Sequence, residues 1–392
     1  MVLSGRLLKF WKVLRYLALL FMAGLAGWFA MAVVPSLSAK VEVEDKPRRI
    51  ESVRTLPDAE PVNLAVSPDG RAAACILKDG VLLVFDEGGM QRLRKELEGA
   101  QFVSVSEDAR WLAVGGKTRA SWWVRILDSE GEQVWRQNVQ GELTALVVAP
   151  GGESAFALMD NRRLYVFDVG ERTRWRRLKM DYVARTAHYS QGADALLIET
   201  SDPRGYGVVD VDGRTRWWRP APPGQFELRS TARGRLIIAL TNTLTPKAEI
   251  IFQTLSPSGR ILFDRRFDGF EPRVAVASDG ERFAISYRRK LKHKEKSVWE
   301  RRISLWDSGG NRLWEQGGLF YKPVLMGALQ NPFGVLVAED FTLLSSLDGY
   351  GGLAWRGPSL GARIVRLESD ENWRLAWAVF ENGNVEVWKL PR

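Results

Sequence analysis

The feature that most constrains this fold is a short motif that recurs at nearly constant spacing. Its full form is D-x-x-G-x-x-x-W, in which a glycine follows the aspartate and a tryptophan follows the glycine. The full copies are Asp128, Gly131, Trp135; Asp210, Gly213, Trp217; Asp307, Gly310, Trp314; and Asp348, Gly351, Trp355. Degenerate copies are Asp86, Gly89, Leu93; Asp168, Glu171, Trp175; and Ser256, Gly259, Phe263. Such self-similarity indicates a repeat architecture.

The first positions of successive copies are separated by 42, 40, 42, 46, 51 and 41 residues. A second series of turn-forming clusters has one member before each copy and one after the last copy. These clusters begin at Ser67, Ser106, Ala149, Ser190, Thr231, Ala277, Gln330 and Glu368. A period of about 40 to 50 residues built from short β-rich runs is typical of propeller blades. The two series therefore predict eight repeat units.

Each unit has the pattern of a four-stranded antiparallel blade, with the Asp/Gly turn before its last strand. The sequence predicts an all-β fold, an eight-bladed β-propeller over residues 49–392, or seven blades if one degenerate unit is not a complete blade. The last unit ends before its fourth strand. Residues 49–56 are predicted to supply that strand, because an open ring would leave exposed sheet edges.

The stretch DVDG at 210–213 also resembles part of a calcium-binding loop. In that register the first and twelfth ligand positions are Val208 and Arg219, and neither side chain is an oxygen ligand for calcium. We therefore interpret Asp210 and Asp212 as turn residues, whose side chains cap tight turns. The sequence predicts no metal site and no catalytic residue.

Composition argues against several classes of protein. The chain has one cysteine, Cys75, and two histidines, His188 and His293, which leaves little material for a zinc site or a catalytic triad. Its net charge is +9, but Lys and Arg alternate with Asp and Glu along the body rather than clustering as in nucleic-acid binders. Nucleic acid is therefore not a predicted partner.

The amino-terminal region predicts a membrane anchor. Residues 16–34 form a run of nineteen uncharged residues, long enough to span a bilayer. We predict a basic cytoplasmic segment over 1–15, a single transmembrane helix over 16–34, a linker over 35–48 and the propeller over 49–392 on the extracytoplasmic side. A cleaved signal peptide with its site near 36–39 is the alternative.

The repeated motif resembles the tryptophan-docking repeat of the PQQ-like propellers, with WD-repeat-like turns such as SPDG at Ser67, over nearly all of 49–392. One branch, the quinoprotein dehydrogenases, implies a PQQ cofactor, calcium and often a bridge between adjacent cysteines, which a chain with only Cys75 cannot form. Another branch includes the propeller lipoprotein of the outer-membrane β-barrel assembly machinery. That branch implies a non-catalytic scaffold, although here an apolar span replaces the lipidated cysteine.

We therefore predict a non-enzymatic, cofactor-free protein-interaction scaffold in the cytoplasmic membrane, with a PQQ-dependent dehydrogenase or a small-ligand sensor as alternatives. The predicted binding surface is the face that carries the long connections between second and third strands. The most basic of these connections contains Arg288, Arg289, Lys290, Lys292, His293, Lys294 and Lys296. It is either a solvated, extended hairpin or a site for an acidic protein partner or anionic headgroups. Trp218 is either an outer packing residue or an exposed contact.

Overall fold

The computed structural model describes residues 48–53, 61–67, 71–87, 90–169, 174–190, 193–230, 236–243, 248–276, 281–293, 296–317, 325–330, 333–339, 343–347, 350, 353–359, 362–369, 375–382 and 384–389. The chain divides into two compact units, Met1–Glu44 and Asp45–Arg392, and all of these residues belong to the second. The predicted anchor, 16–34, lies outside them. Within the described part of the chain, no helix is long and apolar enough to cross a membrane.

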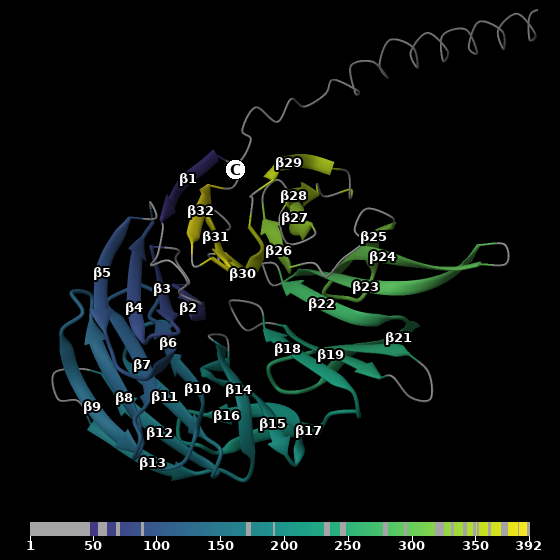
Figure 1. The fold of residues 1–392 in the computed structure, drawn as a ribbon. Coiled ribbons are helices and arrows are strands. Elements are labelled where there is room, and N and C mark those ends of the chain that lie inside the picture. The colour runs from purple at the N-terminus through teal and green to yellow at the C-terminus, as the bar shows by residue number, and fades with distance from the viewer. Residues whose placement is uncertain are drawn as a thin grey trace, which may run out of the picture. The chain divides into compact units, whose positions relative to one another are not determined.

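The strands of the described residues form eight four-stranded antiparallel sheets (Figure 1). The first four sheets are β2 to β5 (Pro61–Val66, Ala72–Leu77, Val81–Asp86, Gln91–Glu96), β6 to β9 (Ala100–Val105, Trp111–Lys117, Trp122–Asp128, Gln133–Val139), β10 to β13 (Leu143–Val148, Ser154–Met159, Arg163–Asp168, Arg174–Lys179) and β14 to β17 (Val183–Ser190, Ala195–Asp202, Arg204–Asp210, Thr215–Pro220).

The other four sheets are β18 to β21 (Gln225–Ser230, Ile237–Thr243, Glu249–Leu255, Ile261–Asp268), β22 to β25 (Phe270–Val276, Arg282–His293, Lys296–Asp307, Arg312–Gly317), β26 to β29 (Leu325–Gln330, Phe333–Glu339, Leu343–Leu347, Leu353–Ser359) and β30 to β32 (Ile364–Ser369, Leu375–Phe380, Val385–Lys389) completed by β1 (Arg48–Val53). The predicted all-β architecture of four-stranded antiparallel sheets is confirmed.

Burial differs between the middle and outer strands of a sheet. Every residue of β3 is buried, whereas exposed and half-buried residues alternate in β5 from Arg92 to Glu96. Middle strands are covered on both faces by neighbouring sheets, so they consist of continuous apolar runs such as AAACIL. The outer strand has one face toward solvent and alternates accordingly.

The Asp/Gly motif forms the turn before the outer strands β9, β17 and β25. The Asp210 carboxylate accepts hydrogen bonds from the backbone N–H groups of Asp212 and Arg214, at 3.0 and 2.8 Å. Gly213 has φ of +77°, a conformation that glycine adopts without strain. Asp128 and Asp307 cap their turns in the same way. Asp348 and Gly351 lie outside the described residues.

At three junctions, the last side chain of one motif packs on the glycine of the next motif, which belongs to the neighbouring sheet. A Cβ added to Gly259 would lie 2.6 Å from the ring of Trp217, and the Trp217 indole N–H donates to the Pro257 carbonyl at 2.8 Å. Phe263 covers Gly310 in the same way, and Leu93 covers Gly131. The motif therefore joins consecutive sheets as well as shaping a turn.

The first and last sheets also pack on each other. β1 pairs with β32 in an antiparallel register that runs from Arg48 opposite Lys389 to Val53 opposite Val385. Phe85 of the first sheet contacts Trp377 of the last, with ring centroids 6.4 Å apart. Both side chains belong to one buried cluster. The strand before β2 therefore completes the sheet that contains the last strand, as residues 49–56 were predicted to do (Figure 1).

We predict that Gly310→Ala destabilises the protein by roughly 2 kcal/mol, measured as the free energy of unfolding in urea. The substitution forces a Cβ onto the Phe263 ring at a residue with φ of +81°. Gly309→Ala is the matched control, because its Cβ would lie no closer than 3.4 Å to any neighbour. Equal unfolding free energies for the two variants would contradict the packing of Phe263 on Gly310.

Candidate functional site: a basic hairpin and a polar cavity on one face

Strand direction places the connections on two opposite faces of the sheets. Because consecutive strands are antiparallel, the hairpin between second and third strands and the connection to the next sheet lie on the same side. We call this side the loop face. The innermost strands β14, β18 and β22 begin there, and the Asp/Gly turns lie on the opposite side.

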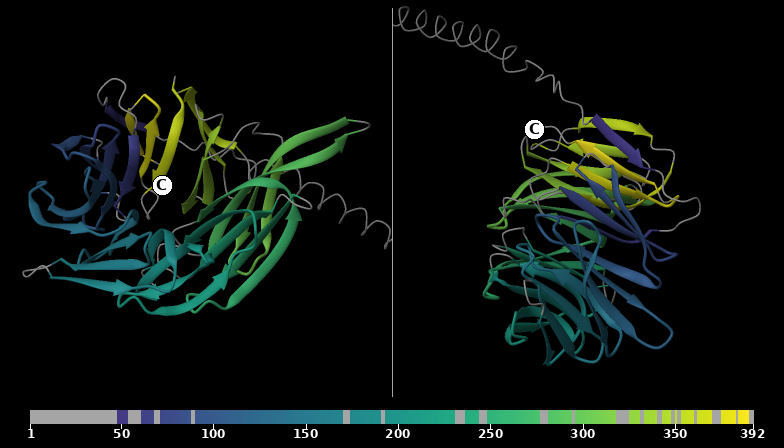
Figure 2. Two further views of the ribbon diagram at one scale, coloured as in Figure 1. Left: turned by 60° about the horizontal axis from the view of Figure 1, so that its bottom comes forward. Right: turned by 90° about the vertical axis from the view of Figure 1, so that its left-hand side faces the viewer.

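Among the described strands, those of the hairpin formed by β23 and β24 are the longest, and this hairpin lies on the loop face. The two twelve-residue strands pair from Arg282 opposite Asp307 to His293 opposite Lys296. On the two sides, β22 pairs with β23 only as far as Arg288, and β25 pairs with β24 only as far as Arg302. Residues 289–293 and 296–301 therefore form a two-stranded ribbon beyond the sheet, which we call the arm. It projects away from the sheets in both Figure 1 and Figure 2.

An exposed aromatic side chain lies where the arm leaves the sheet. Trp299 is 42% exposed and makes an edge contact with Phe270 of β22, with ring centroids 4.3 Å apart. The Arg288 guanidinium lies 5.8 Å from the Trp299 ring centroid and 5.2 Å from that of Phe270. The Lys290 ammonium lies 5.7 Å from the Trp299 centroid. An indole flanked by cations is a frequent component of protein interfaces.

Beneath this exposed surface lies a buried arginine. The Arg301 side chain is 1% exposed and forms an ion pair with Glu271 at 3.0 Å. It also donates to the Ser286 hydroxyl at 3.2 Å, and Glu271 forms a second ion pair with Arg288 at 3.2 Å. Burial lowers the pKa of Arg301 to about 10, although Glu271 opposes that shift. The ion pairs hold the base of the arm against β22.

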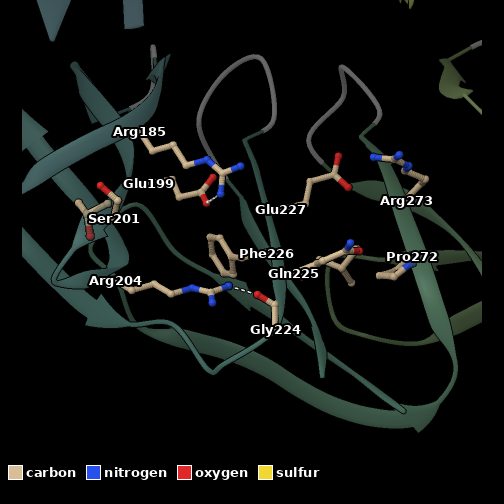
Figure 3. Close-up of a pocket in the computed structure, with 12 residues that line it drawn as sticks. Arg185, Glu199, Ser201, Arg204, Gly224, Gln225, Phe226, Glu227, Pro272 and Arg273 are labelled. Atoms are coloured by element: carbon tan, nitrogen blue, oxygen red, sulfur yellow. Dashed lines mark hydrogen bonds and ion pairs between the residues drawn. The ribbon is translucent and has the colours of Figure 1, made fainter. Parts of the chain in front are cut away.

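A polar cavity of about 470 Å³ opens on the same face, near the starts of β18 and β22 (Figure 3). Its lining includes the cations Arg185, Arg204 and Arg273 and the acids Glu199 and Glu227. Arg273 and the arm-contacting Glu271 lie two residues apart on β22, so the cavity and the base of the arm are neighbours.

The charged side chains that line the cavity are partly compensated by neighbouring groups. Arg185 lies 3.6 Å from the Glu199 carboxylate, and the Arg204 guanidinium donates to the Gly224 carbonyl oxygen (Figure 3). Glu227 pairs with Arg229 at 3.1 Å. Burial raises the pKa of Glu199, and the nearby Arg185 only partly offsets this effect. The site can accept polar or charged groups, with Phe226 as an apolar wall.

The predicted basic residues lie in the arm or at its base. Arg288, Arg289 and Lys290 are described with their side chains, and the latter two are exposed. Lys292, His293 and Lys296 are placed in the paired strands by their backbones only, and Lys294 lies outside the described residues. The expected loop is therefore largely strand, because its residues continue the pairing of β23 with β24.

Trp218 has a packing contact in the structure. Its ring stacks on Tyr182 with centroids 5.2 Å apart and an interplanar angle of 6°, and its indole N–H donates to the Thr200 hydroxyl at 3.2 Å. The side chain is half-buried, and Thr200 also lines the cavity. These contacts agree with the packing interpretation of Trp218 and place it beside the cavity.

Two features of the site were not predicted from the sequence. Phe270 and Trp299 come from different strands, and only the register of the hairpin brings them together. Glu271 and Arg301 are thirty residues apart in the chain. Among the described residues, no group of three or more His, Cys, Asp or Glu side chains could hold a metal ion.

Comparison with known proteins identifies the fold. No protein-family model and no curated protein matches the chain. BamB from Moraxella catarrhalis matches with a TM-score of 0.61 and 14% identity, over 88% of this chain and 98% of that one. The β-propeller domain of Cps50 (Swd1) from Myceliophteria thermophila gives 0.55 and 14%, over 88% and 100%, and the Dos1 propeller gives 0.65 and 11%, over 88% and 95%. This chain has a β-propeller fold.

We predict that Glu199→Gln becomes increasingly favourable to stability, relative to the parent chain, as the pH rises from 4 to 7. A carboxyl whose folded-state pKa is raised stabilises the fold below its unfolded-state pKa and loses that contribution as pH rises through the folded-state pKa. Glutamine does not ionise. Urea unfolding at several pH values measures the difference, with the exposed Glu130→Gln as control. A difference that is constant or falls with pH would contradict the burial effect.

Proposed function

We propose that this chain is a membrane-anchored, non-catalytic β-propeller that acts outside the cytoplasm as a protein-interaction scaffold through its loop face. The arm is the observation that carries this proposal. A four-stranded blade does not need strands that extend beyond their neighbours, and such extra length exposes Trp299 and several cations to solvent. Rigid blades that present one long hairpin provide a stable base for recognition.

The propeller of this proposal has eight blades, each a four-stranded sheet. Three observations support this number: the eight sheets formed by the described strands, the pairing of β1 with β32, and the contacts of β2 with β30 and β31. In this arrangement the last blade takes strands from both ends of the domain. Neither the first nor the last sheet then has an uncovered face.

The anchor of this proposal is residues 16–34, with the propeller beyond the cytoplasmic membrane. Its support is the sequence alone: nineteen uncharged residues preceded by Arg6, Lys9, Lys12 and Arg15, without an acidic residue among the first fifteen. Basic residues before a first span favour the cytoplasm. The linker 35–48 would then connect the span to β1.

We propose that the binding partner of the arm is a protein with an acidic surface. Arg289 and Lys290 are exposed near the Trp299 ring, and the arm's sequence adds Lys292, His293, Lys294 and Lys296 against the acids Glu295 and Glu300. Charge of one sign speeds the association of an oppositely charged partner, and a central aromatic side chain supplies affinity. BamB and Dos1 are likewise propellers, although their low identity supports only the fold.

A small-ligand sensor is the second candidate. The cavity near Glu199 has a volume of about 470 Å³, within the range common for small-molecule sites. Its lining is mainly polar and charged, with few apolar side chains beside Phe226. Most small-ligand pockets are mainly apolar, so the arm is the better-supported site and the cavity is the better place to seek an additional contact.

The test shortens the arm without cutting into the sheet. Residues 289–300 are replaced by Asn-Gly, which joins the paired residues Arg288 and Arg301 through a two-residue turn. Carbonate-washed membranes that carry the full-length parent or the shortened variant are crosslinked and affinity-purified. We expect a partner that is recovered at least about tenfold less with the variant, because an interface loses most of its energy with its central residues.

Thermal unfolding of the purified variant serves as the folding control. Recovery of the same partners in equal yield from both forms would contradict a function for the arm. The washed membranes test the anchor separately: a protein with a mature amino terminus near Lys40 that is lost in the wash would contradict the transmembrane segment.

A further inference from the structure

The arm has an open strand edge. Residues 289–293 of β23 pair with β24 on one side, and no described strand pairs with them on the other. In an antiparallel strand, alternate residues direct their N–H and C=O groups to opposite sides. Part of the backbone between Arg289 and His293 therefore presents donors and acceptors that no described strand satisfies. The sequence RKLKH contains no proline, so every residue retains its N–H group.

A third strand would complete this ribbon. A two-stranded hairpin is only marginally stable in water, and an added third strand contributes further backbone hydrogen bonds and cross-strand contacts. The arm also lacks the bulges and prolines with which many proteins block an exposed edge. The remaining feature that disfavours pairing of this edge with other strands is the positive charge of Arg289, Lys290 and the basic residues that follow.

The positive charge of the arm determines which kind of strand can pair with its open edge. A second copy of the arm would bring cations opposite cations, which is unfavourable in a cross-strand pair. A strand that carries carboxylates would form opposite-charge pairs instead. Because successive side chains point to opposite faces, Arg289 and Lys290 offer a cation on each face of the ribbon. Lys290 is opposite Trp299, so one face also carries an exposed aromatic ring.

We infer that an extended, acidic segment of a partner protein binds by adding as a third strand to the open edge of β23. Backbone hydrogen bonds supply affinity, while carboxylates beside Arg289 and Lys290 supply selectivity. This inference rests on the proposed function of the arm as a protein-binding element. The partner segment is thus extended and acidic. Anionic lipid headgroups cannot bind in this way, because they have no peptide backbone to pair with the strand edge.

The test compares two peptides of equal charge. The first is a capped nonapeptide of alternating glutamate and valine, and the second has two of its valines replaced by proline, which removes two N–H donors and disrupts the strand. Full-length protein in neutral detergent is titrated with each peptide. We expect the first peptide to bind at least about tenfold more tightly. We also expect it to slow amide hydrogen exchange in 289–293, while the second leaves exchange there unchanged.

Two matched charge reversals test where the peptide binds. Arg289→Glu should weaken the first peptide's binding at least about tenfold, whereas Arg94→Glu, an exposed arginine on β5, should leave it unchanged. Equal affinity of the two peptides without exchange protection would overturn strand addition. Protection of 289–293 by vesicles that contain phosphatidylglycerol, but not by the first peptide, would overturn it in favour of lipid. In either case, loss of a crosslinked partner from the shortened arm would still support the proposed scaffold.

Discussion

The contact on which the rest of the structure depends is the packing of the first sheet on the last. Phe85, Leu83 and Cys75 of the first sheet share a buried cluster with Trp377 and Val387 of the last. Without that contact, two apolar sheet faces would be exposed to water, at a cost of about 25 cal/mol per Å² of apolar surface. β1 adds the outer strand to the last sheet, so both ends of the domain stabilise the same contact.

The repeated motif also joins neighbouring sheets to each other. The Asp210 turn fixes the start of β17, and at three junctions the side chain that ends one motif covers the next glycine, as Trp217 covers Gly259. The turns occupy one face of the domain, so the opposite face is free to vary. That face carries the arm, which contacts Phe270 and Glu271 of β22, and the cavity near Glu199, whose lining includes Arg273 of the same strand. The Asp/Gly turns and the proposed binding features therefore lie on opposite faces.

The sequence predicted the features that recur and missed those that depend on register. Periodicity was sufficient for the all-β fold, the turn aspartates such as Asp210 and the pairing of β1 with β32. The basic hairpin was recognisable from composition. The contact of Phe270 with Trp299 and the ion pair of Glu271 with Arg301 were not, because each depends on which residues face one another across strands. The cavity could not be predicted from the sequence for the same reason, because its lining comes from several strands.

Removal of the closing strand tests this account most directly. A chain that begins at Pro57 lacks β1, whereas a chain that begins at Lys40 keeps it. We expect the shorter form to unfold at least about 5 °C lower, measured by thermal unfolding, and to aggregate through the edge of β32. A synthetic peptide of residues 48–56 should partly restore its stability. If both forms are equally soluble and unfold at the same temperature, β1 does not close the propeller and the account is wrong.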